Sequence, residues 1–358
     1  MNNMLSIGIA GAGLLGRLLA WQLARAGHRV SVVDPARDAQ PSFDGRQAAG
    51  FTAAGMLSPL AELDTSSAEV AALGWRSITL WRDIVSRLQS RPQFSTDGSL
   101  LLAHRSDLGS AQRVLARLAS GPAGTPKAQL LTKARLAHLE PALHGGSHAW
   151  LLPGEGQIDP VAALLALQAE APGVTWLWGR SVVSVAPGLL IFEDATQRRF
   201  DLVFDLRGTG SRPELPVRGV RGEMVWLHAP GHGLTRPVRL LHPRHRVYLV
   251  PRPGDVVLVG ASEIESEDRS PVSLRSAVEL MSAAHSVLPA LAEARIQRLD
   301  VNLRPALPDN EPHLETSDGL VRINGLFRHG WLIAPALVQD ALRQCGLAQQ
   351  QTVELAHE

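Results

Sequence analysis

The sequence predicts an α/β protein with a discontinuous Rossmann-like dinucleotide-binding domain and a second domain built on a mixed or antiparallel β-sheet with helices. Three observations predict this class. Residues 4–34 have the pattern of a strand, a glycine-rich turn, a helix, a strand and an acid. Residues 217–260 have the pattern of consecutive short antiparallel strands. Segments of α/β pattern lie on both sides of that stretch, as expected for a nucleotide domain interrupted by insertions.

The first observation concerns the turn Gly11-Ala12-Gly13-Leu14-Leu15-Gly16. It follows an apolar run at 4–10 and opens a helix at 14–26, which Gly27 is placed to end. A second strand at 29–33 ends in Asp34. In such a turn the first glycine permits the tight bend, the second lets the backbone approach a pyrophosphate, and the third lets the helix lie close to the strand.

The helix N-terminus offers unpaired N–H groups to phosphates, and Asp34 is placed to accept hydrogen bonds from ribose hydroxyls. The sequence therefore predicts a dinucleotide site. Its candidate residues are Gly11, Ala12, Gly13, Leu14, Leu15, Gly16 and Asp34.

Composition excludes several classes of protein. Hydrophobic residues make up 45% of the 358 residues and charged residues 19%, as in soluble globular proteins. A net charge of +1 gives no electrostatic reason to expect nucleic acid or an anionic membrane as partner. The only cysteine, Cys345, excludes an intrachain disulfide and a cysteine-rich metal site. No apolar run has membrane-spanning length and no secretory signal opens the chain, so we expect a cytoplasmic protein.

Further elements follow from periodicity and turn residues. Helices are predicted at 68–90, 107–119, 132–139, from Pro160 to about 171, within 271–295 and from Gly330 onwards. Asp159 caps the helix that begins at Pro160, after a loop at 154–160. The helix within 271–295 has as its apolar contacts Val272, Leu274, Val278, Leu280 and Met281. Strands are predicted at 99–103, 174–178, 181–185, 189–192, 199–206, 220–228, 238–242, 247–251, 256–260, 296–303 and 320–324.

Three later features have a functional and a structural interpretation. Tyr248, the only tyrosine, either bonds a carboxylate or anchors a sheet face, and the strand pattern by itself favours the anchor. Arg304 at a strand end suits a bidentate contact with a carboxylate, or it forms a surface ion pair. Residues 327–331 open a helix that can face an anion, or form an ordinary junction. The stretch 242–245 lacks carboxylate partners, so we expect a solvated turn there and no metal site.

The chain resembles the amino-acid oxidase group of FAD enzymes, and most closely the thiamine-pathway glycine oxidases. The resemblance extends over nearly the whole length. Its anchors are residues 11–16 with Asp34, 53–57, 220–223, 248–252, 260–262, 303–305 and 328–335.

The resemblance implies a flavin beside Ala54, Gly55 and Met56, with the adenine end near Val183. It also implies catalytic and substrate-binding roles for Tyr248, Arg304 and Arg328. The implied contacts of the flavin with the last part of the chain are Arg304, His329, Gly330, Trp331 and Leu332.

The sequence departs from the family pattern at several positions. Asp34 replaces the usual glutamate, and either acid can bond ribose. Glu263 stands where an apolar residue is expected and Arg246 where a histidine is expected, so the two either alter the pocket or pair on the sheet surface. The turn Arg207-Gly208-Thr209-Gly210 also differs from the small-residue pattern usual in the family.

The implied reaction is oxidative deamination of glycine, sarcosine or a small D-amino acid, with hydride transfer to flavin N5 and reduction of O₂ to H₂O₂, in thiazole synthesis for thiamine. An NAD-dependent dehydrogenase and a non-catalytic FAD-binding protein stay open as alternatives. A homotetramer is also implied. We expect the FAD-binding domain at 1–90, 150–215 and 300–358, and the substrate-binding domain at 91–149 and 216–299.

Overall fold

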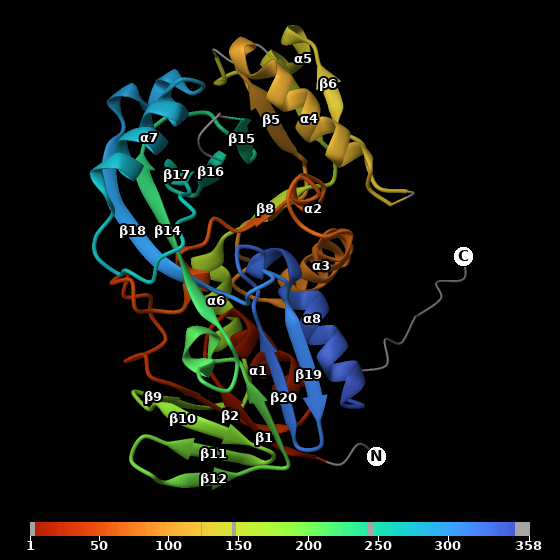
Figure 1. Ribbon diagram of the computed structural model, residues 1–358, viewed down its shortest axis with the longest axis vertical. Coiled ribbons are helices and arrows are strands. Elements are labelled where there is room, and N and C mark those ends of the chain that lie inside the picture. Colours follow the sequence, from red (N-terminus) through yellow and green to blue (C-terminus); the bar gives the residue numbers. More distant parts are fainter. Residues whose placement is uncertain (1–3, 123, 145–147, 242–245, 348–358) are drawn as a thin grey trace.

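The computed structural model describes residues 4–122, 124–144, 148–241 and 246–347. Its two large sheets lie at opposite ends of an elongated molecule (Figure 1). The first sheet has the strand order β19-β20-β13-β1-β2-β9, and the second has the order β18-β14-β17-β16-β15-β5-β7-β6. Both predicted sheets are therefore present, and the two-domain α/β class is confirmed.

The first sheet is parallel except for its edge strand β19. Its strands come from three separate parts of the chain, as expected for a discontinuous domain. They are β1 (Ser6–Ala10), β2 (Arg29–Asp34), β9 (Thr175–Trp178), β13 (Leu202–Asp205), β19 (His313–Ser317) and β20 (Leu320–Asn324). The carboxyl ends of β1, β2 and β13 meet at one edge, where parallel sheets bind their ligands.

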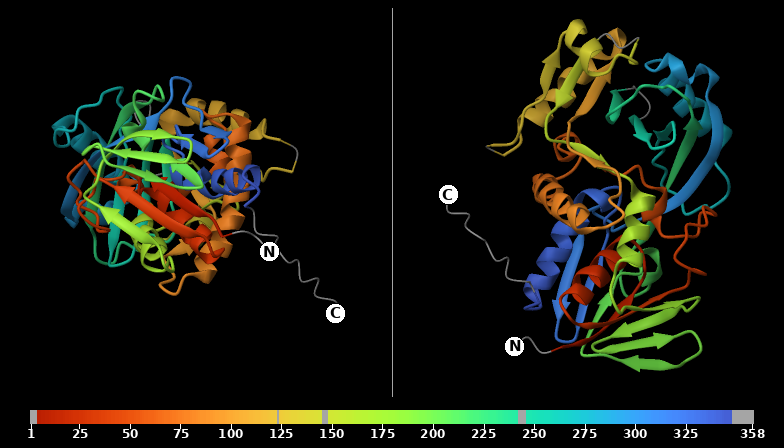
Figure 2. Two further views of the ribbon diagram at one scale, coloured as in Figure 1. Left: turned by 90° about the horizontal axis from the view of Figure 1, so that it is seen from below. Right: turned by 180° about the vertical axis from the view of Figure 1, so that it is seen from behind.

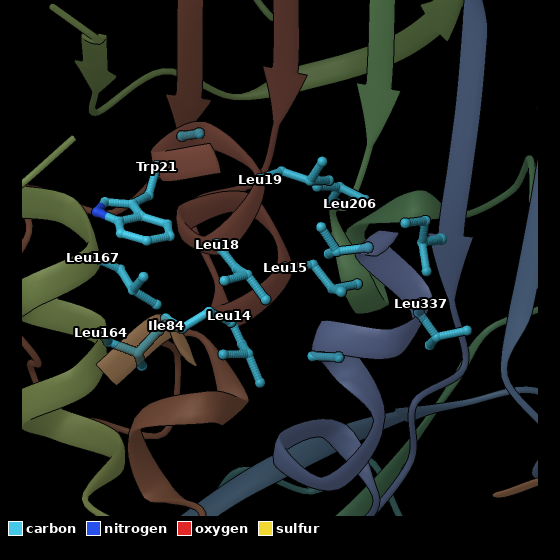
Figure 3. Packing of buried hydrophobic residues seen from close by; sticks show 14 of the residues in the cluster. Leu14, Leu15, Leu18, Leu19, Trp21, Ile84, Leu164, Leu167, Leu206 and Leu337 are labelled. Carbon is cyan, nitrogen blue, oxygen red and sulfur yellow. The ribbon is translucent and has the colours of Figure 1, made fainter. Parts of the chain in front are cut away.

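Helix α1 (Leu14–Arg25) packs on this sheet between two other helices. Figure 3 shows its leucines, among them Leu14 and Leu18, between Leu164 of α6 (Pro160–Ala169) and Leu337 of α8 (Gly330–Gln344). The apolar pattern of the sequence therefore becomes one buried cluster. Helix α3 (Ala68–Arg87) packs on α8, and Trp81 stacks on Trp331 with ring centroids 5.3 Å apart.

The second sheet is mixed, with antiparallel pairing from β14 to β17 as predicted and one parallel pair, β15 with β5. Figure 2 shows this sheet at the far end of the molecule from β1 and β2. Its strands are β5 (Ser99–Ala103), β6 (Gln129–Leu131), β7 (His148–Leu152), β14 (Arg218–His228), β15 (Val238–Leu241), β16 (Arg246–Arg252), β17 (Val256–Gly260) and β18 (Arg295–Ala306).

The remaining elements are short. Helices α2 (Pro59–Glu62), α4 (Leu108–Ala119), α5 (Lys133–Leu139) and α7 (Leu274–His285) connect or cover the sheets. Two small sheets complete the fold, one of β3 (Met56–Leu57), β8 (Gly156–Ile158) and β4 (Phe94–Ser95), and one of β10 (Val182–Ala186), β11 (Leu189–Phe192) and β12 (Gln197–Arg199). No helix in the described part of the chain is both long enough and apolar enough to cross a membrane.

Several sequence predictions were wrong in detail. The loop predicted at 154–160 contains strand β8, because it pairs with β3 and β4 from distant parts of the chain. The strand predicted at 199–206 is shorter. The strands that were not predicted also include β3, β4, β6, β7, β12 and β19. Leu274 and Val278 of α7 are 80% and 50% exposed rather than buried. The turn predicted at 242–245 lies outside the described residues, and β15 ends at Leu241.

Candidate functional site

The glycine-rich turn between β1 and α1 is shaped by close backbone contacts. Gly11 has φ +105°, and a Cβ there would lie 2.6 Å from the Leu206 carbonyl oxygen. A Cβ on Gly16 would lie 1.8 Å from the Gly11 carbonyl oxygen, so only glycine lets α1 approach the turn this closely. Gly13 is the N-cap of α1 and provides no side-chain cap. The first N–H groups of the helix therefore stay available to an anion.

Asp34 at the end of β2 is fixed by the same turn. Its Oδ2 accepts a hydrogen bond from the Ala12 backbone N–H at 2.6 Å, and its Oδ1 accepts one from the Ala36 N–H at 2.8 Å. A carboxylate oxygen accepts more than one hydrogen bond, so both oxygens retain capacity for ribose hydroxyls.

A cavity of about 1040 Å³ extends from this turn to the second sheet. It brings together most of the residues predicted from the sequence, although they come from segments far apart in the chain. Those lining it are Gly11, Gly13, Leu14, Leu15, Asp34, Ala54, Gly55, Met56, Tyr248, Arg304, Arg328, His329, Gly330, Trp331 and Leu332.

Three predicted cofactor-binding residues are absent from the lining. Ala12 and Gly16 act on the cavity indirectly, through the hydrogen bond to Asp34 and the close approach to Gly11. Val183 is not brought to the cavity: its side chain is 48% exposed, while the preceding residue, Val182, lines the wall. Neighbouring side chains of a strand point to opposite faces, and the register of β10 shifts at this point.

The segment 54–56 is held against the cavity by a buried arginine that sequence reasoning missed. Gly55 has φ +64°, and a Cβ there would lie 2.1 Å from the Ile158 carbonyl oxygen. Arg252 donates from Nη2 to the carbonyl oxygens of Ala54 and Ile158, and from Nη1 to Gln157 Oε1 at 3.0 Å. Burial lowers the pKa of Arg252 to about 10, so it stays charged at neutral pH.

The N-terminus of α8 forms another wall. His329 is its N-cap and makes no side-chain cap, so the first N–H groups of the helix are available beside Gly330. Trp331 is fixed on both sides, because its Nε1 donates to the Gly50 carbonyl at 3.0 Å and its carbonyl accepts from Trp81 Nε1 at 2.8 Å.

Tyr248 and Arg304 lie at the end of the cavity formed by the second sheet. The Tyr248 ring covers Gly260, where a Cβ would lie 2.7 Å from the ring, and the Arg304 guanidinium covers Gly222, where a Cβ would lie 2.4 Å from Nη2. Arg304 donates from Nη1 and Nη2 to the Ser262 carbonyl oxygen, both at 3.1 Å. Burial raises the pKa of the Tyr248 phenol, so it stays protonated and able to donate.

Glu62, at the end of α2, contacts three of the basic residues at the same end of the cavity. Its Oε2 accepts from Arg328 Nη2 at 3.0 Å, and its Oε1 accepts from Arg239 Nη2 at 3.2 Å. His329 Nδ1 lies 3.4 Å from Glu62 Oε2. Arg328 Nη1 also donates to Glu263 Oε2 at 3.2 Å. Both arginines and both carboxylates line the cavity.

The protonation states of this cluster follow from its burial and charges. Burial alone would raise the pKa of Glu62, but His329, which is protonated in the acid range where Glu62 titrates, Arg328 and Arg239 outweigh it and lower the pKa to about 2. Burial lowers the pKa of His329 to about 4 in spite of the neighbouring Glu62. At neutral pH the glutamate is therefore ionised and the histidine neutral.

Sequence reasoning missed Glu62, Arg239 and Arg252 and left Glu263 open. Nothing in the local sequence marks Glu62 and Arg239, because each is an isolated charge in an ordinary helix or strand pattern. Arg252 closes the stretch 248–252 that anchors the family resemblance, and that signal could have identified it. Glu263 pairs with Arg328 and lines the cavity, which supports the pocket-altering alternative. For Arg246 the described part is its backbone, which pairs with Leu241. Among the described residues, no group of three or more His, Cys, Asp or Glu could hold a metal ion.

The elongated cavity fits a dinucleotide cofactor. At one end it offers an uncapped helix N-terminus for phosphates and an acid for ribose, and along its length it offers glycines whose Cβ atoms would clash with backbone. At the other end it holds a guanidinium and a phenol that suit a carboxylate. The lining of the cavity thus offers groups for both a cofactor and a small anionic substrate.

Comparisons with known proteins agree with this arrangement. The family model described as DAO, FAD dependent oxidoreductase, matches residues 6–340. The thiamine biosynthesis oxidoreductase ThiO of Rhizobium etli is 35% identical over 338 residues, which cover 94% of this chain and 95% of that protein. A glycine oxidase of Geobacillus kaustophilus is 26% identical over 371 residues, which cover 94% and 91%.

A crystal structure of glycine oxidase from Geobacillus kaustophilus has the same fold, with a TM-score of 0.80 at 23% identity over 98% of this chain and 96% of that one. The family model matches nearly the whole chain, and ThiO is 35% identical over 94% of it. Both findings agree with the residues that surround the cavity. The chain belongs to the DAO family of FAD-dependent oxidoreductases, and FAD is its cofactor.

Proposed function

We propose that the protein oxidises the amine of a small amino acid, with glycine as the leading substrate and sarcosine or a small D-amino acid next. The observation that carries this proposal is the pairing of Arg304 with Tyr248 at the end of the cavity away from the phosphate-binding turn. A charged guanidinium and a protonated phenol are suited to one carboxylate. The names of the relatives, ThiO and glycine oxidase, support the same substrate class.

FAD would be held by the turn at 11–16, Asp34, residues 54–56 and the N-terminus of α8. When bound, it would supply an acceptor for the hydride of the substrate Cα–H bond, with O₂ as the final acceptor of the two electrons and H₂O₂ as the product. Arg304 and Tyr248 hold the carboxylate and fix the direction of the Cα–H bond. The free amine enters neutral, so no side-chain base is needed. The N–H groups at the start of α8 would stabilise the negative charge that develops on a flavin when it is reduced beside this helix.

We propose further that the imine product serves thiazole formation in thiamine biosynthesis, as the name of the Rhizobium etli relative suggests. The location in the cytoplasm and the homotetramer implied by the family resemblance stay predictions. The domain boundaries at 1–90, 150–215 and 300–358 against 91–149 and 216–299 also stay a proposal. The strands of the two large sheets support it, although β7 and β18 cross the boundaries at 149/150 and 299/300.

The test is a panel of amino acids with purified holoprotein. We expect H₂O₂ in air and bleaching of the flavin absorbance without air, with glycine most effective. A flavin that no amino acid bleaches would show a non-catalytic FAD protein, and a colourless protein that reduces NAD would show a dehydrogenase.

Arg304→Ala tests the carboxylate contact. Removing a charged bidentate partner should weaken transition-state binding by about 3 kcal/mol and lower kcat/KM for glycine accordingly. FAD should still be bound. Arg212→Ala is the control, since that arginine is 48% exposed and pairs with Glu267 outside the cavity. Unchanged kinetics in Arg304→Ala would refute the role of this arginine.

A further inference from the structure

Glu263 places a carboxylate in the wall of the substrate end of the cavity. It lies on the loop after β17, and its Oε2 accepts from Arg328 Nη1 at 3.2 Å. Arg328 belongs to the turn before α8, so the pair joins the second sheet to the FAD-binding side of the molecule. The Glu263 side chain is 48% exposed, whereas that of Arg328 is 17% exposed. Glu263 therefore lies between solvent and the buried arginine.

The charges of the substrate end compensate one another except at one place. Arg239, Arg304 and Arg328 carry positive charge, and Glu62 and Glu263 carry negative charge. Glu62 pairs with Arg239 and Arg328, and Glu263 adds a second contact to Arg328. Tyr248 and His329 are neutral at pH 7. One positive charge is left, at Arg304, whose guanidinium donates to the neutral carbonyl of Ser262.

A single substrate carboxylate compensates that remaining charge. A second carboxylate in the same end of the cavity would meet arginines that already have acidic partners, and it would approach Glu263. Like charges brought together in a partly buried site repel strongly, and repulsion of this kind is a common source of specificity.

We propose that Glu263 is a specificity-determining residue that admits amino acids with one carboxylate and excludes those with two. The inference rests on the proposed amino-acid oxidation. A purely structural role for the pair explains less, because ion pairs with a half-exposed partner contribute little to stability. Solubility of the loop does not require the charge of Glu263 either, because the loop already carries another acidic side chain. Glu265, two residues further on, is 66% exposed and pairs with Arg218.

The experiment compares wild type, Glu263→Gln and Glu265→Gln as FAD-loaded proteins. Glu265 is the matched control, because it lies on the same loop and outside the cavity lining. Flavin reduction is measured without air with glycine and with iminodiacetate, which is glycine carrying a second carboxymethyl group on nitrogen. Binding of the unreactive acids acetate and malonate is measured by the change in the flavin spectrum.

In Glu263→Gln we expect the ratio of kcat/KM for iminodiacetate to that for glycine to rise by about tenfold or more. The affinity for malonate relative to acetate should rise by a similar factor, and Glu265→Gln should leave both ratios unchanged. Unchanged ratios in Glu263→Gln, or an equal loss for mono- and dicarboxylates, would overturn the proposal. If no amino acid reduces the flavin in any variant, the proposed function fails, and the malonate-to-acetate ratio still decides the role of Glu263.

Discussion

Replacing Glu62 by glutamine tests whether this buried carboxylate holds the substrate wall together. Glu62 is 8% exposed and accepts from Arg239 and Arg328 at 3.2 and 3.0 Å. Its pKa of about 2 lies well below the ordinary value of 4.5. A difference of this size corresponds to about 3 kcal/mol of folding free energy at pH 7. Breaking a buried pair by removing one partner costs a comparable 3–5 kcal/mol in general.

The sign of the pH dependence follows from the lowered pKa. The ionised Glu62 stabilises the fold fully above pH 4.5, and the stabilisation is lost as the pH falls towards 2, where the folded state takes up the proton. With these two pKa values the contribution falls from about 3 kcal/mol at pH 7 to about 2 kcal/mol at pH 3.5. A glutamine cannot ionise, so the gap between wild type and variant should narrow by about 1 kcal/mol over that range.

The assay is urea unfolding followed by tryptophan and flavin fluorescence at a fixed excess of FAD, at pH 7 and pH 3.5. Glu265→Gln removes the carboxylate of an exposed ion pair and should cost at most about 0.5 kcal/mol. A Glu62→Gln variant within about 1 kcal/mol of wild type at pH 7, or a gap that widens in acid, would refute the reasoning.

Two further predictions concern the cofactor turn and the N-cap of α8. Gly16→Ala should yield protein without flavin absorbance, because the new Cβ would lie 1.8 Å from the Gly11 carbonyl oxygen. The control is Gly109→Ala in α4, where nothing lies within 4 Å of the new Cβ. This variant should retain FAD, and its free energy of unfolding should rise by about 0.5–1 kcal/mol. Equal FAD content in both variants would contradict the argument. Burial lowers the pKa of His329 from 6.5 to about 4, so between these pH values only the unfolded state binds the proton. Wild type should therefore lose up to about 3 kcal/mol of folding stability as the pH falls from 6.5 to 4. His329→Gln should lack this loss, and parallel stability curves for the two proteins would show that His329 is not the titrating group.

The departures from the sequence prediction have a shared physical cause. The alternating side chains of a strand predict that neighbouring residues face opposite sides of the sheet. Which of the two sides faces a cavity depends on the partner strands. Val183 is therefore absent from the cavity lining, where Val182 stands instead, and its contact with the cofactor stays a prediction. The same holds for Leu274 and Val278, whose apolar pattern predicts packing contacts and which are exposed on α7.

The sequence by itself determined the dinucleotide turn, because its requirements are local. Gly11, Gly16 and Asp34 act on backbone and side chains within a strand, a turn, a helix and the next strand, so their spacing is sufficient to predict their roles. The resemblance to known FAD enzymes then added Tyr248 and Arg304, for which the strand pattern offered only alternatives.

Only the tertiary structure decided the charges of the substrate end. The four charged residues of this end come from a short helix, a strand and two loops distributed over much of the chain: Glu62, Arg239, Glu263 and Arg328. Glu62 and Arg239 are unremarkable in their local pattern, and the sequence could not say which groups Glu263 and Arg328 would meet. Their significance arises from burial and from distances near 3 Å, which fix the protonation states and leave one positive charge at Arg304. Coulomb energies depend on separation in space and on exclusion of water, and a sequence specifies neither until the chain has folded.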